Sequence, residues 1–541
     1  MSNAPIVVLN PNAKREQGRR AQLTNIAAAK AVGDIIRTTL GPRAMLKMIL
    51  DAQGSVVLTN DGNAILREID VQHPAAKSII ELSKTQDEGV GDGTTSVAVL
   101  AGELLALAEP FLERNIHPTV IVGAYFRALD DAVNAAESAA LVIDQDNAEE
   151  VGKVIASCLG TKFMNRWAKL MVHLALQAVK TVMVKTNDRI SIDFKNYAKV
   201  EKIPGGEISD SEVLDGVIIN KDVCLGNMKR KIENPRIILL DSPLEYRKGD
   251  SQTNVEITSE ADWGRLLRLE EEFVEKAVAD LLKHKPDLVI TEKGISDLAL
   301  HLLQKAGVAC IRRLRKTDNN RIARATGAVI VNRPEELKES DVGSAGLFEV
   351  RKIGDEYFTY IVQCAAPKAC SIVLRGGSKD VLNEIERNLM DAMCVARNVM
   401  LNPKLVPGGG AIEMTVSQVL AAKAKTIQGT SQAPYAAVGE ALEVIPRTLA
   451  ENCGANVIRV LTQLRAKHAD GANTSWGIDG NKGVVTDMVT LGVWEPLEVK
   501  VQTLKTAVEA AAMLLRIDDI VSGISKKKEH GGPNMDQDDL D

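Results

Sequence analysis

The sequence has few aromatic residues and no long apolar run. Phe, Trp and Tyr supply 3% of its 541 residues, so aliphatic side chains carry most of the burial. That composition suits helix-rich layers better than a β-sandwich built on aromatic pairs. The longest apolar stretch, 97–108, is interrupted by Glu103 and falls short of the roughly 18 residues of a membrane span. Residues 1–20 lack the order of charge and apolar stretch that a secretory signal needs.

Cysteine and charge exclude further classes of protein. The seven cysteines are scattered and never spaced C-x-x-C, which argues against a disulfide framework or a zinc site. Cys364 and Cys370 are close enough in sequence to bridge, but two reduced thiols suit a reducing compartment better. The 66 basic and 72 acidic residues leave a net charge of −6, which gives no general reason to expect nucleic acid. We therefore expect a cytoplasmic protein with no membrane or nucleic-acid partner.

Two common nucleotide-binding motifs are also missing. No G-x-x-x-x-G-K-[ST] loop occurs, and residues 89–93 do not complete a G-x-G-x-x-G pattern. Instead, the segment Gly91-Asp92-Gly93-Thr94-Thr95-Ser96 opens an apolar helix. A helix start offers free N–H groups to phosphate, glycines allow close approach, and a carboxylate such as Asp92 suits Mg²⁺. The alternative is an ordinary Asp/Thr-rich helix cap.

The predicted secondary structure changes twice along the chain. Residues 25–140 are mainly helical, with helices expected over 68–87 and 96–112, and the helical pattern returns over 411–465 and 499–516. Between them, β-rich bursts at 217–219, 237–240, 288–290 and 329–331 alternate with helical stretches at 263–284 and 296–305, which indicates an α/β domain. The polar segment 241–262 and the charged helix after it suggest a projection, and the tail after Ser525 is expected to be disordered.

Four further features favour a phosphate site when they are taken together. Thr38-Thr39-Leu40-Gly41-Pro42 ends a helix with a glycine turn, and Pro407-Gly408-Gly409-Gly410 precedes a helix with a costly run of glycine. Asn60-Asp61-Gly62 offers a carboxylate, although such a sequence is also a common β-turn. Asp391 lies in the helical stretch 382–400, where the alternative is a solvated acid on a helix face.

In this order, these segments resemble the nucleotide pocket of the chaperonins, and in detail that of the group II chaperonins. The resemblance continues through Trp494-Glu495-Pro496-Leu497 and residues 515–520, so it covers nearly the whole chain. Residues 71–77, 316–324 and 441–447 resemble the gamma branch of the eukaryotic cytosolic chaperonins, TRiC/CCT.

The resemblance implies a multi-domain α and α/β fold of the chaperonin type. A helical, discontinuous equatorial ATPase domain would comprise residues 1–148 and 404–541. Intermediate hinge segments would comprise 149–216 and 368–403. The α/β apical domain, 217–367, would bind unfolded chains and carry a helical protrusion that serves as a lid.

The resemblance also implies a site for ATP and Mg²⁺. Asp92 would bind Mg²⁺, and Asp391 would orient or deprotonate the attacking water with Asp61 assisting. ATP would be held by residues from both chain ends and from the loop expected to sense the γ-phosphate: Gly41, Gly93, Thr94, Thr95, Ser96, Thr161, Lys162, Gly409, Gly480, Asn481, Glu495 and Lys500.

The expected partners follow from the same resemblance. Seven paralogous chaperonin subunits would complete a hetero-oligomeric double ring of eight-membered rings, and ATP-driven lid closure would enclose and fold clients such as actin, tubulin and β-propeller proteins. Strand-forming segments near the termini, including residues 5–9, would make ring contacts through edge strands. The alternative for residues 5–9 is unpaired terminal coil.

Three rival functions stay open at this point. Asp, Mg²⁺ and phosphate loops also suit a small-molecule kinase. The basic stretch 312–324 could bind RNA, but it lacks interleaved aromatic residues for base stacking, and a solvated or subunit-facing surface explains it better. A chiefly structural ring subunit with weak turnover is the third alternative.

Overall fold

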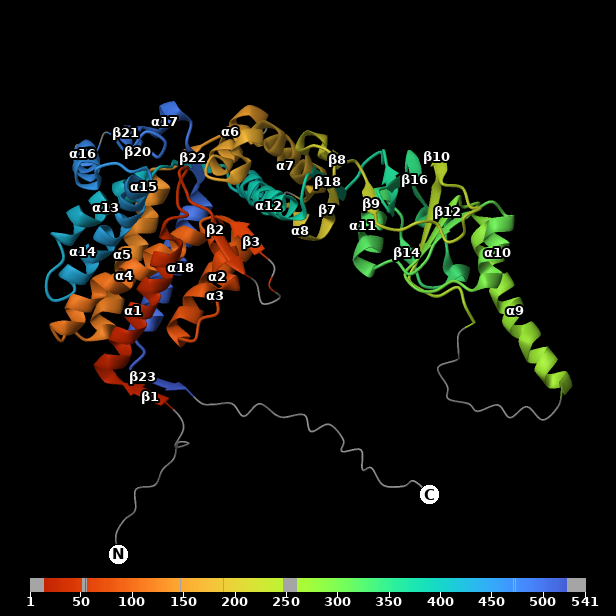
Figure 1. The fold of residues 1–541 in the computed structure, drawn as a ribbon, viewed down its shortest axis with the longest axis horizontal. Coiled ribbons are helices and arrows are strands. Elements are labelled where there is room, and N and C mark those ends of the chain that lie inside the picture. Colours follow the sequence, from red (N-terminus) through yellow and green to blue (C-terminus); the bar gives the residue numbers. More distant parts are fainter. Residues whose placement is uncertain are drawn as a thin grey trace, which may run out of the picture.

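The computed structural model describes residues 14–522 except 51–53, 55, 146, 188, 247–259, 470 and 472. The expected strand at residues 5–9 and the tail after Ser525 therefore lie outside the described residues. Figure 1 shows three parts in a row: a helical part made from both chain ends, a smaller middle part, and an α/β part from which helix α9 (Glu260–Lys283) projects. Each part has a large hydrophobic core of its own.

The helical part joins the first and last thirds of the chain. Its core contains residues 26–136 and 406–515, and helix α4 packs against both α1 and α18. The first third supplies β1 (Lys14–Gln17), α1 (Gly18–Arg37), β2 (Lys47–Leu50), β3 (Val56–Thr59), α2 (Gly62–Glu68), α3 (Pro74–Gly89), α4 (Thr94–Glu113), α5 (Pro118–Ser138) and β4 (Leu141–Val142). The last third supplies β19 (Lys404–Pro407), α13 (Ala411–Ala424), α14 (Gln432–Leu442), α15 (Val444–Asn452), α16 (Val457–Ala469), β20 (Trp476–Asp479), β21 (Val484–Asp487), α17 (Met488–Leu491), β22 (Trp494–Pro496), α18 (Leu497–Leu515) and β23 (Asp519–Ser522).

Two small sheets fasten these ends together. Strand β1 pairs antiparallel with β23, and Arg15 makes a 2.6 Å ion pair with Asp519 across the two strands. Strand β19 lies between β4 and β22, so it also joins the two chain ends. Figure 1 shows β1 and β23 side by side below the helices.

The middle part is also discontinuous. It contains α6 (Ala148–Leu159), a 3₁₀ turn (Phe163–Trp167), α7 (Ala168–Val182), β5 (Val184–Thr186), β6 (Arg189–Ser191), α8 (Phe194–Tyr197), β7 (Ala198–Pro204), a 3₁₀ turn (Ile208–Asp210), β8 (Glu212–Leu214), β18 (Cys370–Gly376) and α12 (Lys379–Leu401). Strand β18 runs parallel to β7 and antiparallel to β8. Helices α6, α7 and α12 share one core, so the orientation of α12 is fixed by the middle part.

The α/β part has two sheets. The first has the order β13-β12-β11-β14, all parallel, with β15 antiparallel to β11; the second is antiparallel with the order β10-β16-β17-β9. Its elements are β9 (Val217–Ile219), β10 (Lys231–Glu233), β11 (Arg236–Leu240), α9, β12 (Leu288–Thr291), α10 (Asp297–Lys305), β13 (Ala309–Ile311), α11 (Lys316–Thr326), β14 (Ile330–Val331), 3₁₀ turns Pro334–Glu336 and Glu339–Asp341, β15 (Gly343–Ser344), β16 (Leu347–Ile353) and β17 (Glu356–Val362).

Most elements expected from the sequence are present, but the helix predicted over 68–87 is wrong as a single element. Helix α2 ends at Glu68 and α3 begins at Pro74. Proline lacks the N–H that a continuous helix would need, so it starts a helix more readily than it continues one. The ring nitrogen Nδ1 of His73 accepts a 3.2 Å hydrogen bond from Ala75 N and caps α3.

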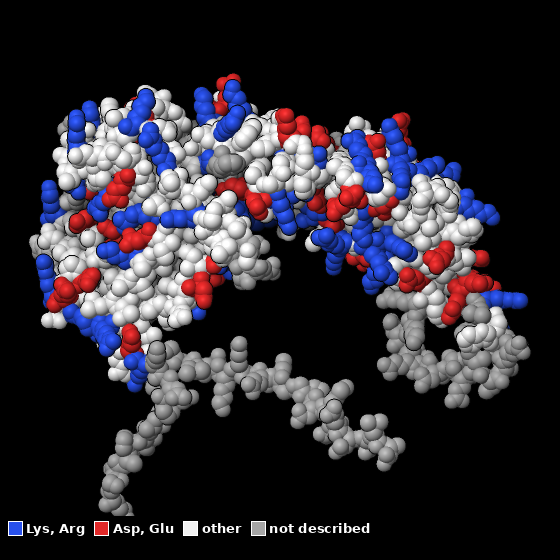
Figure 2. Space-filling view, in the orientation of Figure 1, with Lys and Arg blue, Asp and Glu red and all other residues white. Residues whose placement is uncertain are grey.

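Helix α4 is long and apolar enough to cross a membrane, and it is the one such helix among the described residues. It lies inside the helical part, where α1, α3, α14 and α18 surround it. Its apolar composition therefore serves the core of this part. Figure 2 shows Lys and Arg side chains interspersed with Asp and Glu over the visible face of the whole molecule.

Candidate nucleotide-binding site

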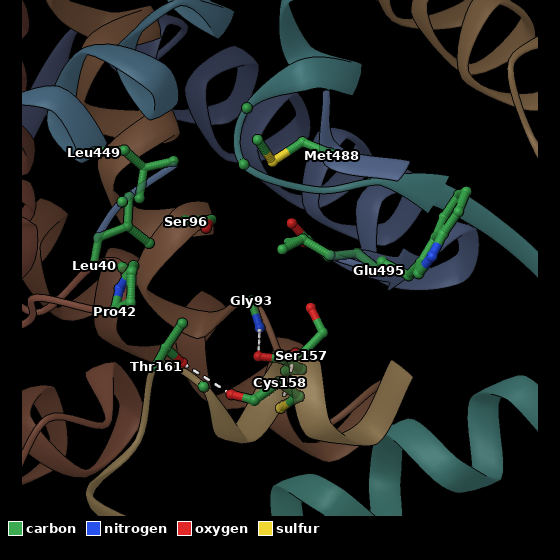
Figure 3. Close-up of a pocket in the computed structure, with 18 of the residues that line it drawn as sticks. Leu40, Pro42, Gly93, Ser96, Ser157, Cys158, Thr161, Leu449, Met488 and Glu495 are labelled. Atoms are coloured by element: carbon green, nitrogen blue, oxygen red, sulfur yellow. Dashed lines mark hydrogen bonds between the residues drawn. The ribbon is translucent and has the colours of Figure 1, made fainter. Parts of the chain in front are cut away.

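A cavity of about 810 Å³ lies where the two chain ends and the middle part meet. Thirteen of the residues predicted to bind nucleotide or metal line it, namely Gly41, Asp92, Gly93, Thr94, Thr95, Ser96, Thr161, Lys162, Gly409, Gly480, Asn481, Glu495 and Lys500. Asp61 and Asp391 are not among the lining residues and lie behind them. In Figure 3, Gly93, just before α4, and Ser96, in the first turn of α4, face the cavity, and Met488 and Glu495 face it from the opposite side.

The start of α4 presents free donors to this cavity. Gly93 is the residue before the helix, has a φ of 78° and provides no side-chain cap. The first N–H groups of α4 are therefore free of a side-chain acceptor, and they carry the partial positive charge of the helix start. Asp92 Oδ1 accepts a 2.7 Å hydrogen bond from Gly93 N, which fixes the carboxylate beside these donors.

A second helix start reaches the cavity from the other end of the chain. Gly409 and Gly410 both have positive φ, at 64° and 80°, and Gly410 directly precedes α13. A Cβ on Gly409 would lie 2.6 Å from Met488 Sδ and 3.0 Å from the carbonyl oxygen of Ile478. Glycine is needed there because both the backbone angle and the close packing exclude a side chain.

Asp391 reaches the edge of the cavity through Lys162. Its Oδ2 lies 2.7 Å from Lys162 Nζ, and the two side chains are 14% and 12% exposed. Burial raises the pKa of Asp391 to about 8, although Lys162 opposes the shift. Burial disfavours the charged form of Lys162, but Asp391 and Asp61 outweigh it and raise its pKa well above the usual value. The pair thus places beside the cavity a carboxyl group whose pKa burial raises to about 8.

Helix α12, which carries Asp391, is docked on the loop that precedes Asp92. Asn398 Nδ2 donates a 2.8 Å hydrogen bond to Val90 O, and Arg397 Nη2 donates a 2.6 Å bond to Gly89 O. Gly91 leaves room for Cys394, whose Sγ would lie 2.1 Å from any Cβ at position 91. Movement of α12 would therefore disturb both Asp391 and the loop of Asp92.

Asp61 lies between the start of α2 and the start of α4. It precedes α2 and caps it, since Oδ2 accepts a 3.0 Å hydrogen bond from Ala64 N, and its Oδ1 accepts a 3.3 Å bond from Thr94 Oγ1. The predicted turn at residues 60–62 is thus a helix start that contacts the first residue of α4.

Lys500 forms the opposite wall together with two acids. Its Nζ lies 2.6 Å from Glu413 Oε1 and 2.6 Å from Glu495 Oε2. Burial opposes its charge, but the two carboxylates outweigh burial and raise the pKa of Lys500 above the usual value. Lys500 is therefore a fixed cation that holds the pocket-facing side chain of Glu495.

Several lining residues were absent from the predicted site: Thr39, Asn60, Lys153, Ser157, Cys158, Asn165, Asp479, Met488, Thr490 and Thr503. Thr39 and Asn60 could have been included, because they belong to the quoted motifs at 38–42 and 60–62. Asn60 Nδ2 donates a 2.8 Å hydrogen bond to Thr161 O and so ties the loop of Lys162 to the pocket. The remaining residues reach the pocket through tertiary packing that has no local sequence signal.

The site fits a magnesium-bound polyphosphate. Asn60 Oδ1 is buried and has no hydrogen-bond partner among the described residues, although Asn60 lines the cavity, so a ligand could satisfy it. Within the described part of the chain, no group of three or more His, Cys, Asp or Glu residues could hold a metal by itself. Mg²⁺ commonly takes one or two carboxylates and completes its shell with phosphate and water oxygens. Asp92 lies beside the start of α4, in a cavity that the start of α13 also lines at Gly410, and this arrangement matches that pattern.

Comparison with known proteins assigns this architecture to a family. Residues 32–525 match the family described as the TCP-1/cpn60 chaperonin family. The chain belongs to this chaperonin family. It is 63% identical over 534 residues to T-complex protein 1 subunit gamma of Oxytricha granulifera, covering 98% of this chain and 96% of that relative. Proteins of the same name from Xenopus laevis and Arabidopsis thaliana are each 61% identical over 533 and 536 residues, covering 98% of this chain and 97% of each relative.

The predicted family and its gamma branch are thereby confirmed, as is the multi-domain chaperonin fold. As a group II chaperonin subunit, the chain takes part in protein folding within an assembly of related subunits, and ATP dependence is general in this family.

Proposed function

We propose that this chaperonin subunit binds Mg²⁺–ATP in the 810 Å³ cavity and hydrolyses it to ADP and phosphate. The observation that carries this proposal is the convergence of both chain ends and the Lys162 loop on one cavity, with Asp391 ion-paired behind it. The N–H groups at the start of α4 and the backbone at Gly41 would bind the phosphates, and Gly409 would approach from the other chain end. Gly480, Asn481, Glu495 and Lys500 would face the nucleoside.

The hydrolytic step would depend on Asp391. In the ionised state it would orient the water and accept its proton, while Asp61 would help to hold the water in place. Bound Mg²⁺, held by Asp92, would supply compensation of phosphate charge. Thr161 and Lys162 lie on the loop between α6 and the 3₁₀ turn, where the γ-phosphate would alter the ion pair with Asp391.

Hydrolysis would be coupled to movement because the parts of the site belong to different cores. We propose an equatorial domain of residues 1–148 and 404–541, hinge segments 149–216 and 368–403, and an apical domain 217–367. Three separate hydrophobic cores support this division. A γ-phosphate that contacts Lys162 only when the hinge part is closed over the pocket would shift the population toward closure.

The product of this cycle would be folding of enclosed proteins. The apical domain would bind incompletely folded clients, among them actin and tubulin, and the protrusion that includes α9 would close as a lid. α9 extends away from the α/β core, which supports a projecting role (Figure 1). We place this activity in the cytoplasm, within two stacked rings that each contain this chain and seven paralogous subunits.

The hairpin of β2 and β3 supports the proposed ring contacts. Met48 pairs with Leu58 and Leu50 pairs with Val56, so these four side chains share one face. They are 41–72% exposed, and the hairpin is a two-stranded sheet with both edges unpaired within the described residues. An apolar face beside open strand edges suits contact with a neighbouring subunit.

Nucleotide binding is tested by photolabelling the assembled complex with azido-ATP, with and without Mg²⁺, and reading the label on this subunit. Gly409→Val places a side chain where even a Cβ meets Met488 and Ile478, so we expect more than a tenfold loss of labelling at subsaturating nucleotide, in line with strain at a positive-φ site. Gly429→Val is the matched control, because Gly429 also has positive φ but has open space around it. Equal labelling of both variants would refute the proposed pocket.

A further inference from the structure

The residue below the wall of the pocket, Glu413, has no role in the function proposed so far. It lies in the first turn of α13, three residues after Gly410, and its side chain is 8% exposed. One carboxylate oxygen, Oε1, holds Lys500 at 2.6 Å. The other, Oε2, is buried and has no hydrogen-bond partner among the described residues.

A second, small cavity adjoins this glutamate. Its volume is about 20 Å³, and Glu413 lines it together with Ser96, Lys500 and Thr503. The last three residues also line the large cavity, so the small one lies directly behind the pocket wall. A space of this size holds one water, and a buried carboxylate oxygen without a partner is costly. The remaining lining is apolar, from residues such as Leu100, Val416 and Leu504.

We propose that Glu413 is a positioning residue of the nucleotide pocket. It anchors Lys500 from below, and Lys500 in turn holds Glu495 at the pocket wall, while one internal water in the small cavity binds the second oxygen of Glu413. This inference rests on the proposed nucleotide site and adds to it a residue that the nucleotide does not touch, since Glu413 does not line the large cavity.

The charge balance explains why Glu413 matters. Lys500 is shared between two carboxylates at equal distances of 2.6 Å. If Glu413 is made neutral, the full attraction of the buried ammonium falls on Glu495, which is the more exposed of the two acids at 31%. Because Lys500 and Glu495 are already in contact, the loss of the lower charged anchor lets this pair shift from its place at the pocket wall, so nucleotide affinity falls.

The small cavity also connects Glu413 to the magnesium side of the pocket. Thr503 Oγ1 accepts a 3.2 Å hydrogen bond from Gln86 Nε2, and the same amide nitrogen lies 3.0 Å from the carbonyl oxygen of Asp92. A water that joins Glu413 to Ser96 or Thr503 thus completes a buried polar network beneath α4, α13 and α18. Such networks fix geometry when every member has a partner.

The test is a double-mutant cycle on azido-ATP affinity, read on this subunit in the assembled complex. Glu413→Gln is expected to weaken the affinity for azido-ATP about five- to tenfold. This lies within the usual range of coupling energies between residues that contact one another, as Glu413 and Lys500 do. Because Glu413 acts through Glu495, the double variant Glu413→Gln/Glu495→Gln is expected to bind as Glu495→Gln alone does. Glu443→Gln is the matched control: Glu443 is similarly buried and paired with Arg465, but it lies outside both cavities, so its affinity stays at the wild-type value.

Unchanged affinity in Glu413→Gln, or independent effects of the two substitutions that multiply, would overturn the inference. Absence of labelling in the wild-type subunit would instead overturn the proposed nucleotide site. If Glu413→Gln does not enter the complex, Glu413→Asp, which shortens the reach toward Lys500, takes its place in the same cycle with the same two outcomes. A density map that resolves ordered waters is expected to show one water at Glu413 Oε2, and a dry cavity there would refute the water site.

Discussion

Replacement of Asp391 by Asn is expected to separate ATP hydrolysis from ATP binding if Asp391 has the proposed role. The side chain keeps its shape but loses the ability to accept a proton. Because a positioned general base typically contributes 10²–10⁴-fold, we expect turnover by this subunit to fall by about 100-fold or more. Affinity for ATP should stay within about threefold, since Asp391 does not line the cavity and no ligand contact is removed.

The same substitution has a local cost in stability that can be measured. Lys162 loses a partner at 2.7 Å in a site where both side chains are less than 15% exposed. Above about pH 8, where Asp391 is ionised, removing one member of this buried pair is expected to cost about 3–5 kcal/mol, and the nearby carboxylate of Asp61 favours the lower end of that range; below that pH Asp391 is protonated and the cost is smaller. Hydrogen exchange in the loop 160–162 should therefore become faster by a corresponding factor, while the α/β part stays protected.

The assay uses a complex in which the other subunits are inactive in ATP hydrolysis, so that the remaining turnover belongs to this chain. Asp131→Asn is the matched control, because Asp131 makes a 2.9 Å ion pair with Lys423 outside the pocket and should leave turnover unchanged. Turnover of Asp391→Asn within tenfold of the wild type would refute the role of Asp391 as base.

Two further predictions concern pH and assembly. Because burial raises the pKa of Asp391 to about 8, turnover by this subunit should rise with pH up to about 8 and level off above it. The folded state holds the proton of Asp391 more tightly than the unfolded chain does. The contribution of Asp391 to the free energy of unfolding therefore declines from about pH 4 to about pH 8. Both trends should vanish in Asp391→Asn, as measured by the pH profile of turnover and by chemical denaturation. Met48→Glu puts a charge on the exposed face of the β2–β3 hairpin and should reduce entry into rings, measured by native mass; Ile458→Glu, at an 81% exposed site on α16, should assemble normally.

Local sequence was sufficient for the parts of the site that one segment builds. Glycines next to Asp, Thr and Ser before an apolar run indicate a phosphate-binding helix start, and residues 92–96 of that segment do line the cavity. The strands at 217–219 and 237–240 were also predictable, because short β-branched runs between helices have few alternatives.

Long-range pairings had no such signal. Asp391 by itself is compatible with a solvated helix face, and only the fold brings Lys162 to it. Glu413 follows a glycine motif in a helix, where an acid is an ordinary residue, and only the fold brings Lys500 of α18 to it. Without the resemblance to the chaperonins, the sequence would have predicted a phosphate-binding loop but not the residues that surround it.

Because both chain ends build the core of the helical part, that core cannot be completed until late in synthesis. On the ribosome, α1, α4 and α5 emerge before the middle and α/β parts, yet the helix α18 that completes their core is synthesised only after those parts. The middle and α/β parts can form their own hydrophobic cores while the apolar faces of α1, α4 and α5 are still uncovered by α18. Nascent chains should therefore expose these apolar faces for most of translation. We expect this chaperonin subunit itself to need other chaperones while it is being synthesised.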